Sequence, residues 1–313
     1  MSYSYSKYLV TVSVVALMSA CSTGRSGKDE PSVPAVSTAD QRQINMTVLL
    51  DLSSRVKATY GQDNQLNRDV AVVQSTATWF KESTAKRGAY GAKGIYNIFF
   101  EPQPTLDANL NEVASSLSFD MSKPNMEPQA KKEIFDTIVP KSTQGVKRLY
   151  ESVVKQPALG ADIWSFAKDK MASRCILDTA KYRNILVLVT DGYIDYKTNR
   201  EIKGNKSAFI NAPYISNTLV GKGGFTAANW SEKYKAGQYG LIVPPGTNLK
   251  GLEVLVVEIN NYNGPIFHKD LLKQYIGDWF QGMGASRVAV LSSDLPSTPS
   301  QKSVNFLTIS SRA

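Results

Sequence analysis

The sequence predicts an α/β protein with a doubly wound, mostly parallel central sheet and helices on both faces. Five short apolar runs alternate along the chain with longer amphipathic segments, which is typical of βαβ units. Right-handed crossovers between such strands place helices on both sides of one sheet. The apolar runs are nearly continuous, as expected for strands that are covered on both faces.

The predicted strands share a run of apolar or β-branched residues that polar residues or glycines bound. They are INMTVLLDLSS (44–54), GIYNIFFEP (94–102), RNILVLVTDG (183–192), GLEVLVVEIN (251–260) and SRVAVLSSD (286–294). The tail KSVNFLTISSRA (302–313) is expected to add an edge strand.

The predicted helices carry apolar residues at three- and four-residue spacing. In segment 67–86 these are Val70, Val73, Ala77 and Phe80. The other predicted helices are 108–117, 130–139, 143–154, 162–175 and 268–284. Most of the chain between 107 and 175 is therefore expected to be helical.

Residues 1–20 have the features of a secretory signal peptide. One cation, Lys7, precedes an apolar run from Tyr8 to Met18, which is too short to span a bilayer comfortably. The ending LMSAC resembles the lipobox of bacterial lipoproteins and predicts lipidation of Cys21. The alternative is a plain signal peptide with an incidental cysteine.

Residues 21–41 are predicted to form a flexible tether, and residues 42–313 one globular domain. The tether is rich in Ser, Gly and Pro and has little apolar surface to bury. Lipidation of Cys21 would leave Cys175 as the only thiol, so no internal disulfide is expected. The sequence thus predicts a domain held to a membrane by a lipid anchor.

The charge distribution argues against nucleic-acid binding. The chain has 36 basic and 27 acidic residues, but its Lys and Arg residues are scattered rather than clustered with aromatics. Common enzyme signatures are also missing from the sequence, which has one histidine, His268, and no Gly-x-Ser-x-Gly, phosphate loop or Cys-x-x-Cys. We therefore expect a binding protein and not an enzyme.

Residues 193–250 fit the βαβ alternation poorly and are predicted to be an insertion, with a small hairpin within it. They are polar, glycine-rich and aromatic-bearing. Two roles for the aromatic residues are open: anchors for a partner, or packing of the insertion onto the domain. The residues concerned are Tyr193, Tyr196, Phe209, Tyr214, Phe225, Trp230, Tyr234 and Tyr239.

Two predicted strands end in loops that bear oxygen ligands. The first supplies Asp51 and Ser53, and the third supplies Thr190, Asp191 and Gly192. In a parallel sheet these loops meet at one edge, where α/β proteins bind ligands. Hard cations such as Mg²⁺ prefer such carboxylate and hydroxyl oxygens. The alternative is structural, because Asp-Gly is a common turn and DLSS can cap a helix.

The two motifs together resemble the von Willebrand factor type A (vWA) family. In that family Asp-x-Ser-x-Ser ends the first strand, Gly-Thr-Asp-Ile lies in a later loop, and Thr-Asp-Gly ends the fourth strand. Together they form the metal-ion-dependent adhesion site (MIDAS). VLLDLSS and LVTDG match the first and last motifs, and the resemblance implies that Asp51, Ser53 and Asp191 ligate a metal.

Two positions depart from the family pattern. Arg55 stands where the second Ser is expected, and Ala161 stands for the Thr in GADI, with Asp162 after it. Two hypotheses follow. In the first, Asp51, Ser53 and Asp191 hold a weakened Mg²⁺ site. In the second, the domain has no cofactor, and Arg55 fills the cation position by bonding the carboxylates of Asp51 and Asp191.

The resemblance implies binding of an unknown protein ligand, or adhesion, at a site that includes Asp51, Ser53, Arg55, Asp162 and Asp191. With Cys21 lipidated, the expected location is the bacterial cell envelope, at the outer membrane. The alternative function is an Mg-dependent phosphatase of the haloacid-dehalogenase type with Asp51 as nucleophile. That family needs Asp-x-Asp, whereas Ser53 occupies the third position here.

Overall fold

The computed structural model describes residues 40–57, 59–60, 63–102, 108–156, 160–196, 200–261, 264–293 and 304–308. The contacts of the chain separate Met1–Thr38 from a compact unit, Ala39–Ala313. The predicted signal peptide, Cys21 and most of the predicted tether lie outside the described residues. Among the helices that are described, none is both long enough and apolar enough to cross a membrane.

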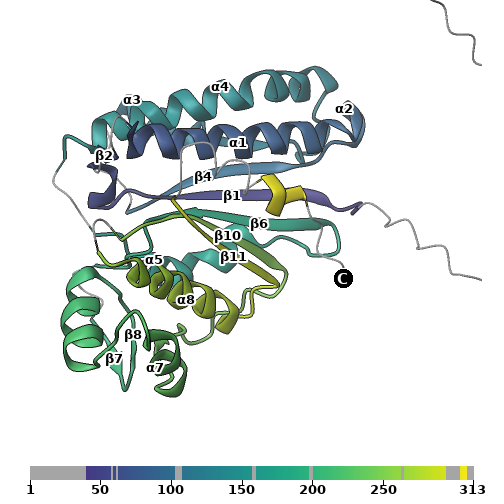
Figure 1. Cartoon of the computed structure of the whole chain (residues 1–313). Coiled ribbons are helices and arrows are strands. Elements are labelled where there is room, and N and C mark those ends of the chain that lie inside the picture. Colours follow the sequence, from purple (N-terminus) through teal and green to yellow (C-terminus); the bar gives the residue numbers. More distant parts are fainter. Residues whose placement is uncertain are drawn as a thin grey trace, which may run out of the picture. The chain divides into compact units, whose positions relative to one another are not determined.

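The core of the unit is one six-stranded sheet in the order β11-β10-β6-β1-β4-β5 (Figure 1). Its strands are β1 (Gln43–Asp51), β4 (Ile95–Glu101), β5 (Ser118–Asp120), β6 (Tyr182–Val189), β10 (Leu252–Ile259) and β11 (Arg287–Ser292). All neighbouring pairs are parallel except β4 with β5. The prediction of a mostly parallel α/β sheet is confirmed.

Strand β5 was not predicted, because it lies in a stretch that the sequence analysis assigned mostly to helices. It has three residues, and of these only Phe119 is buried. A strand this short shows no alternation of apolar and polar residues that a sequence pattern can detect. It pairs with β4 along Ile95–Asn97.

One face of the sheet is covered by α1, α2, α3 and α4, which lie together above it in Figure 1. Their bounds are α1 (Gln65–Ala85), α2 (Gly88–Gly91), α3 (Ala108–Ser115) and α4 (Pro128–Val153). The buried side chains of this layer include Val73, Phe80 and Leu149, which pack against Leu50 and Val187 of the sheet.

The two helices predicted at 130–139 and 143–154 form the single helix α4, which contains Pro140. A proline inside a helix removes one backbone hydrogen bond. The apolar face nevertheless continues across it, since Ile138 and Val146 are both buried. Burial of this face outweighs the local cost of the proline.

The opposite face is covered by α5 (Ile163–Phe166), η2 (Ala167–Met171), α6 (Ala172–Cys175) and α8 (Ile266–Gly282). The first three follow one another without a break and correspond to the helix predicted at 162–175. Cys175 is buried here, and burial raises the pKa of its thiol to about 12. This thiol is therefore a packing residue.

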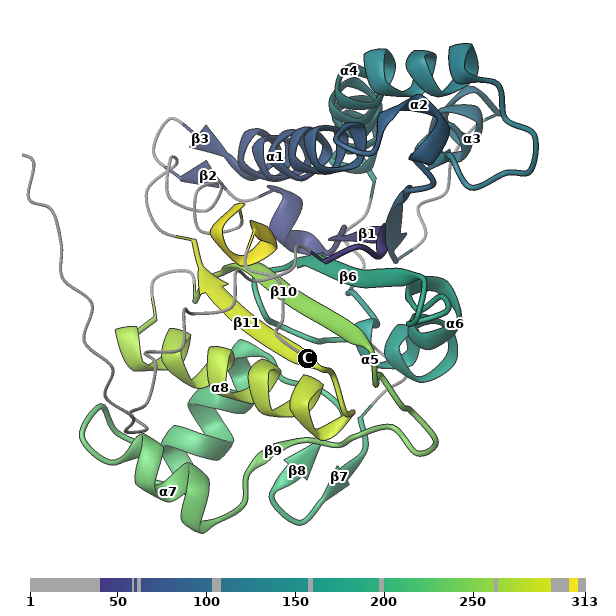
Figure 2. The ribbon, with the colours of Figure 1, turned by 90° about the vertical axis from the view of Figure 1, so that its right-hand side faces the viewer.

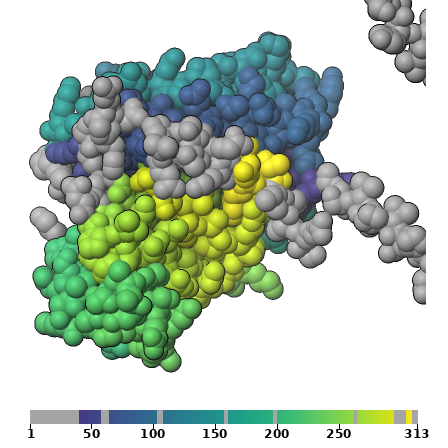
Figure 3. Space-filling view, in the orientation of Figure 1, coloured from purple at the N-terminus to yellow at the C-terminus, as the bar shows by residue number. Residues whose placement is uncertain are grey.

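The insertion 193–250 is ordered where it is described and packs below α8 (Figure 2). It contains β7 (Ile202–Lys203), β8 (Lys206–Ser207), β9 (Gly240–Leu241), η3 (Tyr214–Lys222) and α7 (Trp230–Ala236). Strands β7 and β8 form the predicted hairpin, and β9 pairs with β8 in parallel. The space-filling view shows the insertion in direct contact with α8 (Figure 3).

The aromatic residues of the insertion serve mainly to pack it onto the domain. Phe209, Tyr214, Phe225 and Tyr234 are buried in the same core as α8. Tyr193, Trp230 and Tyr239 are partly buried against that core. Of the two roles left open by the sequence, packing is the one that these residues perform.

Three short elements follow β1 and lead into α1: η1 (Ser54–Lys57), β2 (Thr59–Tyr60) and β3 (Asp63–Asn64). The C-terminal tail does not form the expected edge strand where it is described. Residues 304–308 are helical, and Phe306 and Leu307 are buried. Phe306 also stacks on the guanidinium of Arg287 at 3.8 Å from the ring centre.

Candidate functional site

The strand order places the motif loops at a topological switch point. From β1 the chain first builds outward through β4 to β5, and then returns to add β6, β10 and β11 on the other side of β1. In doubly wound sheets ligands bind beside the carboxyl ends of the strands at the point where this order reverses. We call this side of the sheet the carboxyl edge and define it by Asp51, Glu101, Asp162, Thr190 and Asp191.

Asp51 and Thr190 join the two motif loops directly. The hydroxyl of Thr190 donates to Oδ2 of Asp51 at 2.6 Å, and the backbone N–H of Gly192 donates to the Thr190 hydroxyl at 3.1 Å. The other Asp51 oxygen, Oδ1, accepts from the backbone N–H of Ser53 at 2.8 Å. Burial raises the pKa of Asp51, while the Arg55 charge and these hydrogen bonds oppose the shift.

Glu101 adds a second carboxylate beside Asp51. It ends β4 in register with Asp51 at the end of β1. Burial raises the pKa of Glu101 to about 7; the charge of Lys170 opposes the shift, and the charges of Asp162 and Asp51 add to it. The charges of two neighbouring carboxylates therefore disfavour the ionisation of Glu101.

Asp162 contacts Glu101 at the carboxyl edge and also caps the helix that follows it. Its Oδ1 accepts from the backbone N–H of Ser165 at 2.9 Å and so caps α5. Its own backbone N–H donates to the carboxylate of Glu101. Asp191 closes its own loop, because its Oδ1 accepts from the backbone N–H of Tyr193 at 3.0 Å.

Arg55 does not bond the two motif carboxylates, so that part of the second site hypothesis is wrong. Its Nη1 and Nη2 donate to the two carboxylate oxygens of Asp69 in α1, at 2.7 and 2.9 Å. Its contact with Asp51 is made to the backbone carbonyl, at 3.1 Å. The reason is geometric: Arg55 lies in η1 on the α1 side of the sheet, where Asp69 offers a planar bidentate partner.

The Arg55–Asp69 pair belongs to a larger buried polar network behind the carboxyl edge. The hydroxyl of Tyr150 in α4 donates to Asp69 at 2.6 Å, and Gln65 Nε2 donates to the other Asp69 oxygen at 2.8 Å. Gln65 also reaches Glu258 at 3.3 Å. The network thus ties α1 and α4 to the end of β10.

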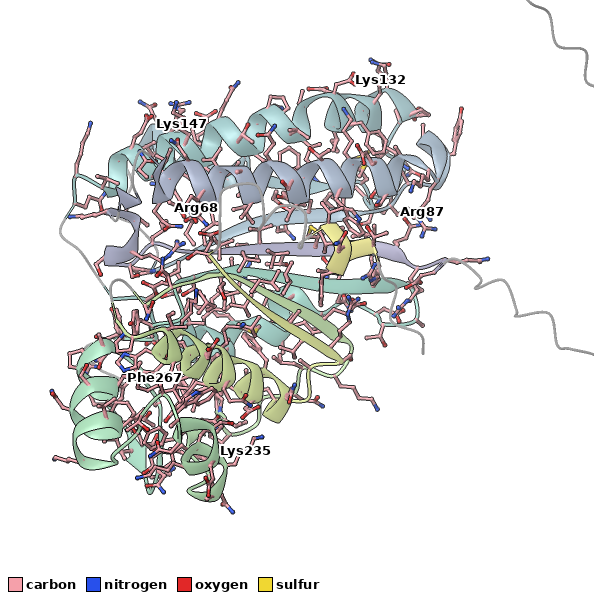
Figure 4. The ribbon with its side chains drawn as sticks, in the orientation of Figure 1. Arg68, Arg87, Lys132, Lys147, Lys235 and Phe267 are labelled. Atoms are coloured by element: carbon pink, nitrogen blue, oxygen red, sulfur yellow. The ribbon has the colours of Figure 1, made fainter. Side chains whose placement is uncertain are left out.

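Glu258 lies at an irregular end of β10. Its φ is 73°, a backbone conformation that residues other than Gly rarely adopt. The register of β10 with β11 shifts between Val256 and Ile259, on either side of it. Arg68 of α1 holds its carboxylate with two bonds, at 2.7 and 3.2 Å, and Figure 4 labels Arg68 where α1 faces the sheet.

The hydrogen bonds of Asp51 and the spacing of the acidic side chains bear on the metal hypothesis. Both Asp51 oxygens already accept hydrogen bonds from the protein. Within the described part of the chain, no three His, Cys, Asp or Glu side chains are arranged to hold a metal ion. The donor atoms are hard oxygens of the kind that Mg²⁺ prefers, and the weakened site of Asp51, Ser53 and Asp191 stays a hypothesis.

Sequence reasoning missed Glu101 and Asp69. Glu101 could have been found, because it ends a predicted strand in FFEP in the same way that Asp51 ends LLD. Asp69 gave no such signal: it lies inside a helix among polar residues, and only the packing of η1 against α1 makes it the partner of Arg55. His268, the one histidine of the sequence, lies in the first turn of α8.

The fold is that of a doubly wound α/β domain with acidic residues at the carboxyl edge of its sheet. No family model matches the chain, and no curated protein matches it. Among solved structures, the chain is similar to the pilus adhesin SpaC from Lactobacillus rhamnosus GG, at a TM-score of 0.39 and 9% identity, over 86% of this chain and 30% of the adhesin.

Two further solved structures show comparable similarity. The minor pilin PilB from Streptococcus sanguinis has a TM-score of 0.33 and 13% identity, over 86% of this chain and 61% of the pilin. The mussel byssus proximal thread matrix protein 1 has a TM-score of 0.30 and 14% identity, over 85% and 47% of the two chains. The chain spans less than two thirds of each of these proteins, and similarities this low carry no argument about function.

Proposed function

We propose that this protein is an envelope-anchored, vWA-like domain that recognises a protein partner through its carboxyl edge. The partner would supply a basic side chain to the acidic groups there. Anchoring would come from a lipid on Cys21, with the outer membrane of a bacterial cell as the location. The role is binding or adhesion and not catalysis.

The observation that carries this proposal is the group of carboxylates at the switch point. Burial raises the pKa of Glu101 to about 7, and the charges of Asp162 and Asp51 add to this shift. A Lys or Arg from a partner would stabilise the ionised forms, since an opposite charge within a few ångströms lowers a carboxyl pKa. Binding energy is thus available to a cationic partner at this edge.

Two further features support the vWA-like class. The motifs DLS and TDG stand at the ends of the neighbouring strands β1 and β6 and share the Thr190–Asp51 hydrogen bond. The strand order is that of a doubly wound sheet, with its switch point at these two strands. Both features position a binding edge without requiring a resident metal.

The phosphatase alternative finds no support at Asp51. No acid stands two residues after it, since that residue is Ser53. The general acid that such a reaction requires is therefore missing.

A pull-down tests the proposal. Three forms of residues 22–313 are immobilised, and the proteins that each form retains from an envelope extract are compared. The wild type is compared with Ser54→Arg, which adds a cation at an exposed position beside Asp51, and with Ser173→Arg, which adds one at an exposed position in α6. We expect one protein to be retained by the wild type and by Ser173→Arg and lost with Ser54→Arg. Retention should persist in EDTA.

Equal retention by both variants would overturn recognition at the carboxyl edge. Loss of retention in EDTA would show instead that a divalent cation completes the site. That result would restore the weakened Mg²⁺ site of Asp51, Ser53 and Asp191.

A further inference from the structure

We propose that the opposite side of the sheet docks on anionic lipid headgroups. We call this side the amino edge and define it by Arg42, Lys86, Arg87, Lys93 and Lys181. Arg42, Lys93 and Lys181 lie just before β1, β4 and β6, and Lys86 and Arg87 lie between α1 and α2. The inference goes beyond the proposed partner site, which lies at the other end of the same strands.

Three of the cations surround one surface hollow. A cavity of about 380 Å³ is lined by Arg42, Lys93 and Lys181, together with Gln41, Gln43, Ala180 and Tyr182. Gln43 holds the two neighbouring segments in place, since its backbone N–H donates to Lys181 O at 2.8 Å. Its side-chain oxygen accepts from the backbone N–H of Lys93 at 3.1 Å. The hollow has the charge and size to take a phosphate-bearing headgroup.

Arg87 fixes the point at which the chain enters the domain. Its Nη1 donates to the backbone carbonyl of Gln41 at 2.8 Å, and its Nη2 donates to that of Asp40 at 3.2 Å and also to that of Arg42. Figure 4 labels Arg87 at the start of β1, beside α2. The first described residues are thus held at the amino edge.

Chain length connects this edge with a membrane. Nineteen peptide links separate Asp40 from Cys21, so the connecting chain can span at most about 65 Å. A lipid on Cys21 would keep the amino edge within that distance of the bilayer. The lipid surface is therefore the partner that this edge meets at the highest local concentration.

Tyr90 gives the same edge an amphipathic contact. Its side chain is 85% exposed, which is unusual for an aromatic residue. The segment around it is held in place by Lys131, whose Nζ donates to the backbone carbonyls of Tyr90 at 3.3 Å and Ala92 at 2.8 Å. Tyrosine is enriched at the level of lipid headgroups because its ring is apolar and its hydroxyl is polar.

The positive charge of the edge is only partly compensated. Asp40 pairs with Arg42 at 2.7 Å, and Asp178 pairs with Lys181 at 3.1 Å across an exposed contact. Over the described part of the chain, Lys86 and Lys93 are exposed and form no ion pair. Exposed cations of this kind attract an anionic surface, and each contributes roughly a fivefold gain in binding.

The test is vesicle flotation of residues 22–313, which lack the signal peptide and Cys21 but keep the whole compact unit Ala39–Ala313. The double variant Lys93→Glu/Lys181→Glu is compared with Lys147→Glu/Lys235→Glu, which changes the net charge equally. Figure 4 shows Lys147 and Lys235 on α4 and α7, away from Arg87. Thermal unfolding of both variants checks that each is folded.

We expect the wild type to float with vesicles that contain about one third phosphatidylglycerol, and not with neutral phosphatidylcholine vesicles. The Lys93/Lys181 variant should bind at least tenfold more weakly, and the control variant nearly as well as the wild type. Equal loss in both variants, equal binding to neutral vesicles, or no binding by the wild type would each overturn the proposal. None of these outcomes bears on recognition at the carboxyl edge.

Discussion

Among single residues, Arg55 stands out because its charge is buried in the interior and requires a counter-charge. Its side chain and that of Asp69 are both fully buried, and the shorter of their two bonds is 2.7 Å. An ion removed from water needs such a partner, because an uncompensated buried charge loses its hydration without replacement. Asp69 meets this need and also accepts hydrogen bonds from Tyr150 and Gln65.

Asp69→Asn should therefore destabilise the domain strongly. It keeps the shape of the side chain but leaves Arg55 without its counter-charge, for which we expect a loss of about 3 to 5 kcal/mol in the free energy of unfolding. Urea unfolding measures this loss. The control is Asp136→Asn, which removes an exposed pair with Lys132 and should cost far less than Asp69→Asn. Similar losses in the two variants would contradict the role given to Asp69.

Glu101 should make stability fall as the pH rises. Its pKa in the folded state, about 7, is above the ordinary value of 4.5, so the folded chain binds its proton more tightly than the unfolded chain does. This contribution is fully present below pH 4.5 and is lost as the pH rises through 7. We expect a loss of about 1 to 2 kcal/mol, because solvent screens part of the interaction.

Glu101→Gln should remove this pH dependence, since an amide does not titrate and its oxygen can still accept from the backbone N–H of Asp162. The measurement is the free energy of unfolding at pH 5 and pH 8 for both forms. If the wild type and the variant lose the same free energy between these pH values, the raised pKa of Glu101 is not what makes the stability depend on pH.

At the scale of elements, the parts that the sequence predicted are those with strong periodicity or long apolar runs. All five predicted strands and the helix of 67–86 are present, because each buries enough apolar surface to leave a pattern. Strand β5 has three residues, which are too few to leave a recognisable pattern in the sequence. The tail was predicted to be a strand but is helical at residues 304–308. Only Phe306 and Leu307 are buried there, and two buried residues do not define the period of a helix or a strand.

The candidate site was predicted in part for a related reason. Asp51 and Thr190 follow buried strands, so topology alone brings them to one edge, and the structure joins them at 2.6 Å. The direction of a long side chain is not fixed by its place in a motif. Arg55 has the length to point to either side of the sheet, and the position of Asp69 in α1 decides its direction.

In the molecule as a whole, basic residues lie where the parallel strands begin and acidic residues lie where they end. The strands β1, β4 and β6 begin at the cations of the amino edge and end at the carboxylates of the carboxyl edge. A chain with a net charge of +9 thus carries a locally acidic end. A parallel sheet makes this separation possible, because all its loops of one kind lie at one end. We therefore propose that the membrane lies at one end of the sheet and the protein partner at the other.

Recognition of a partner at the carboxyl edge can be measured by photo-cross-linking in intact cells that produce the full chain. A benzophenone side chain replaces Ser54 beside Asp51, or Ser173 in α6 as the control; both positions are exposed. If the partner binds at the carboxyl edge, position 54 gives one discrete cross-linked product, which is weaker or missing from position 173. Products of equal yield at both positions, or a product from position 173 alone, would contradict binding at this edge.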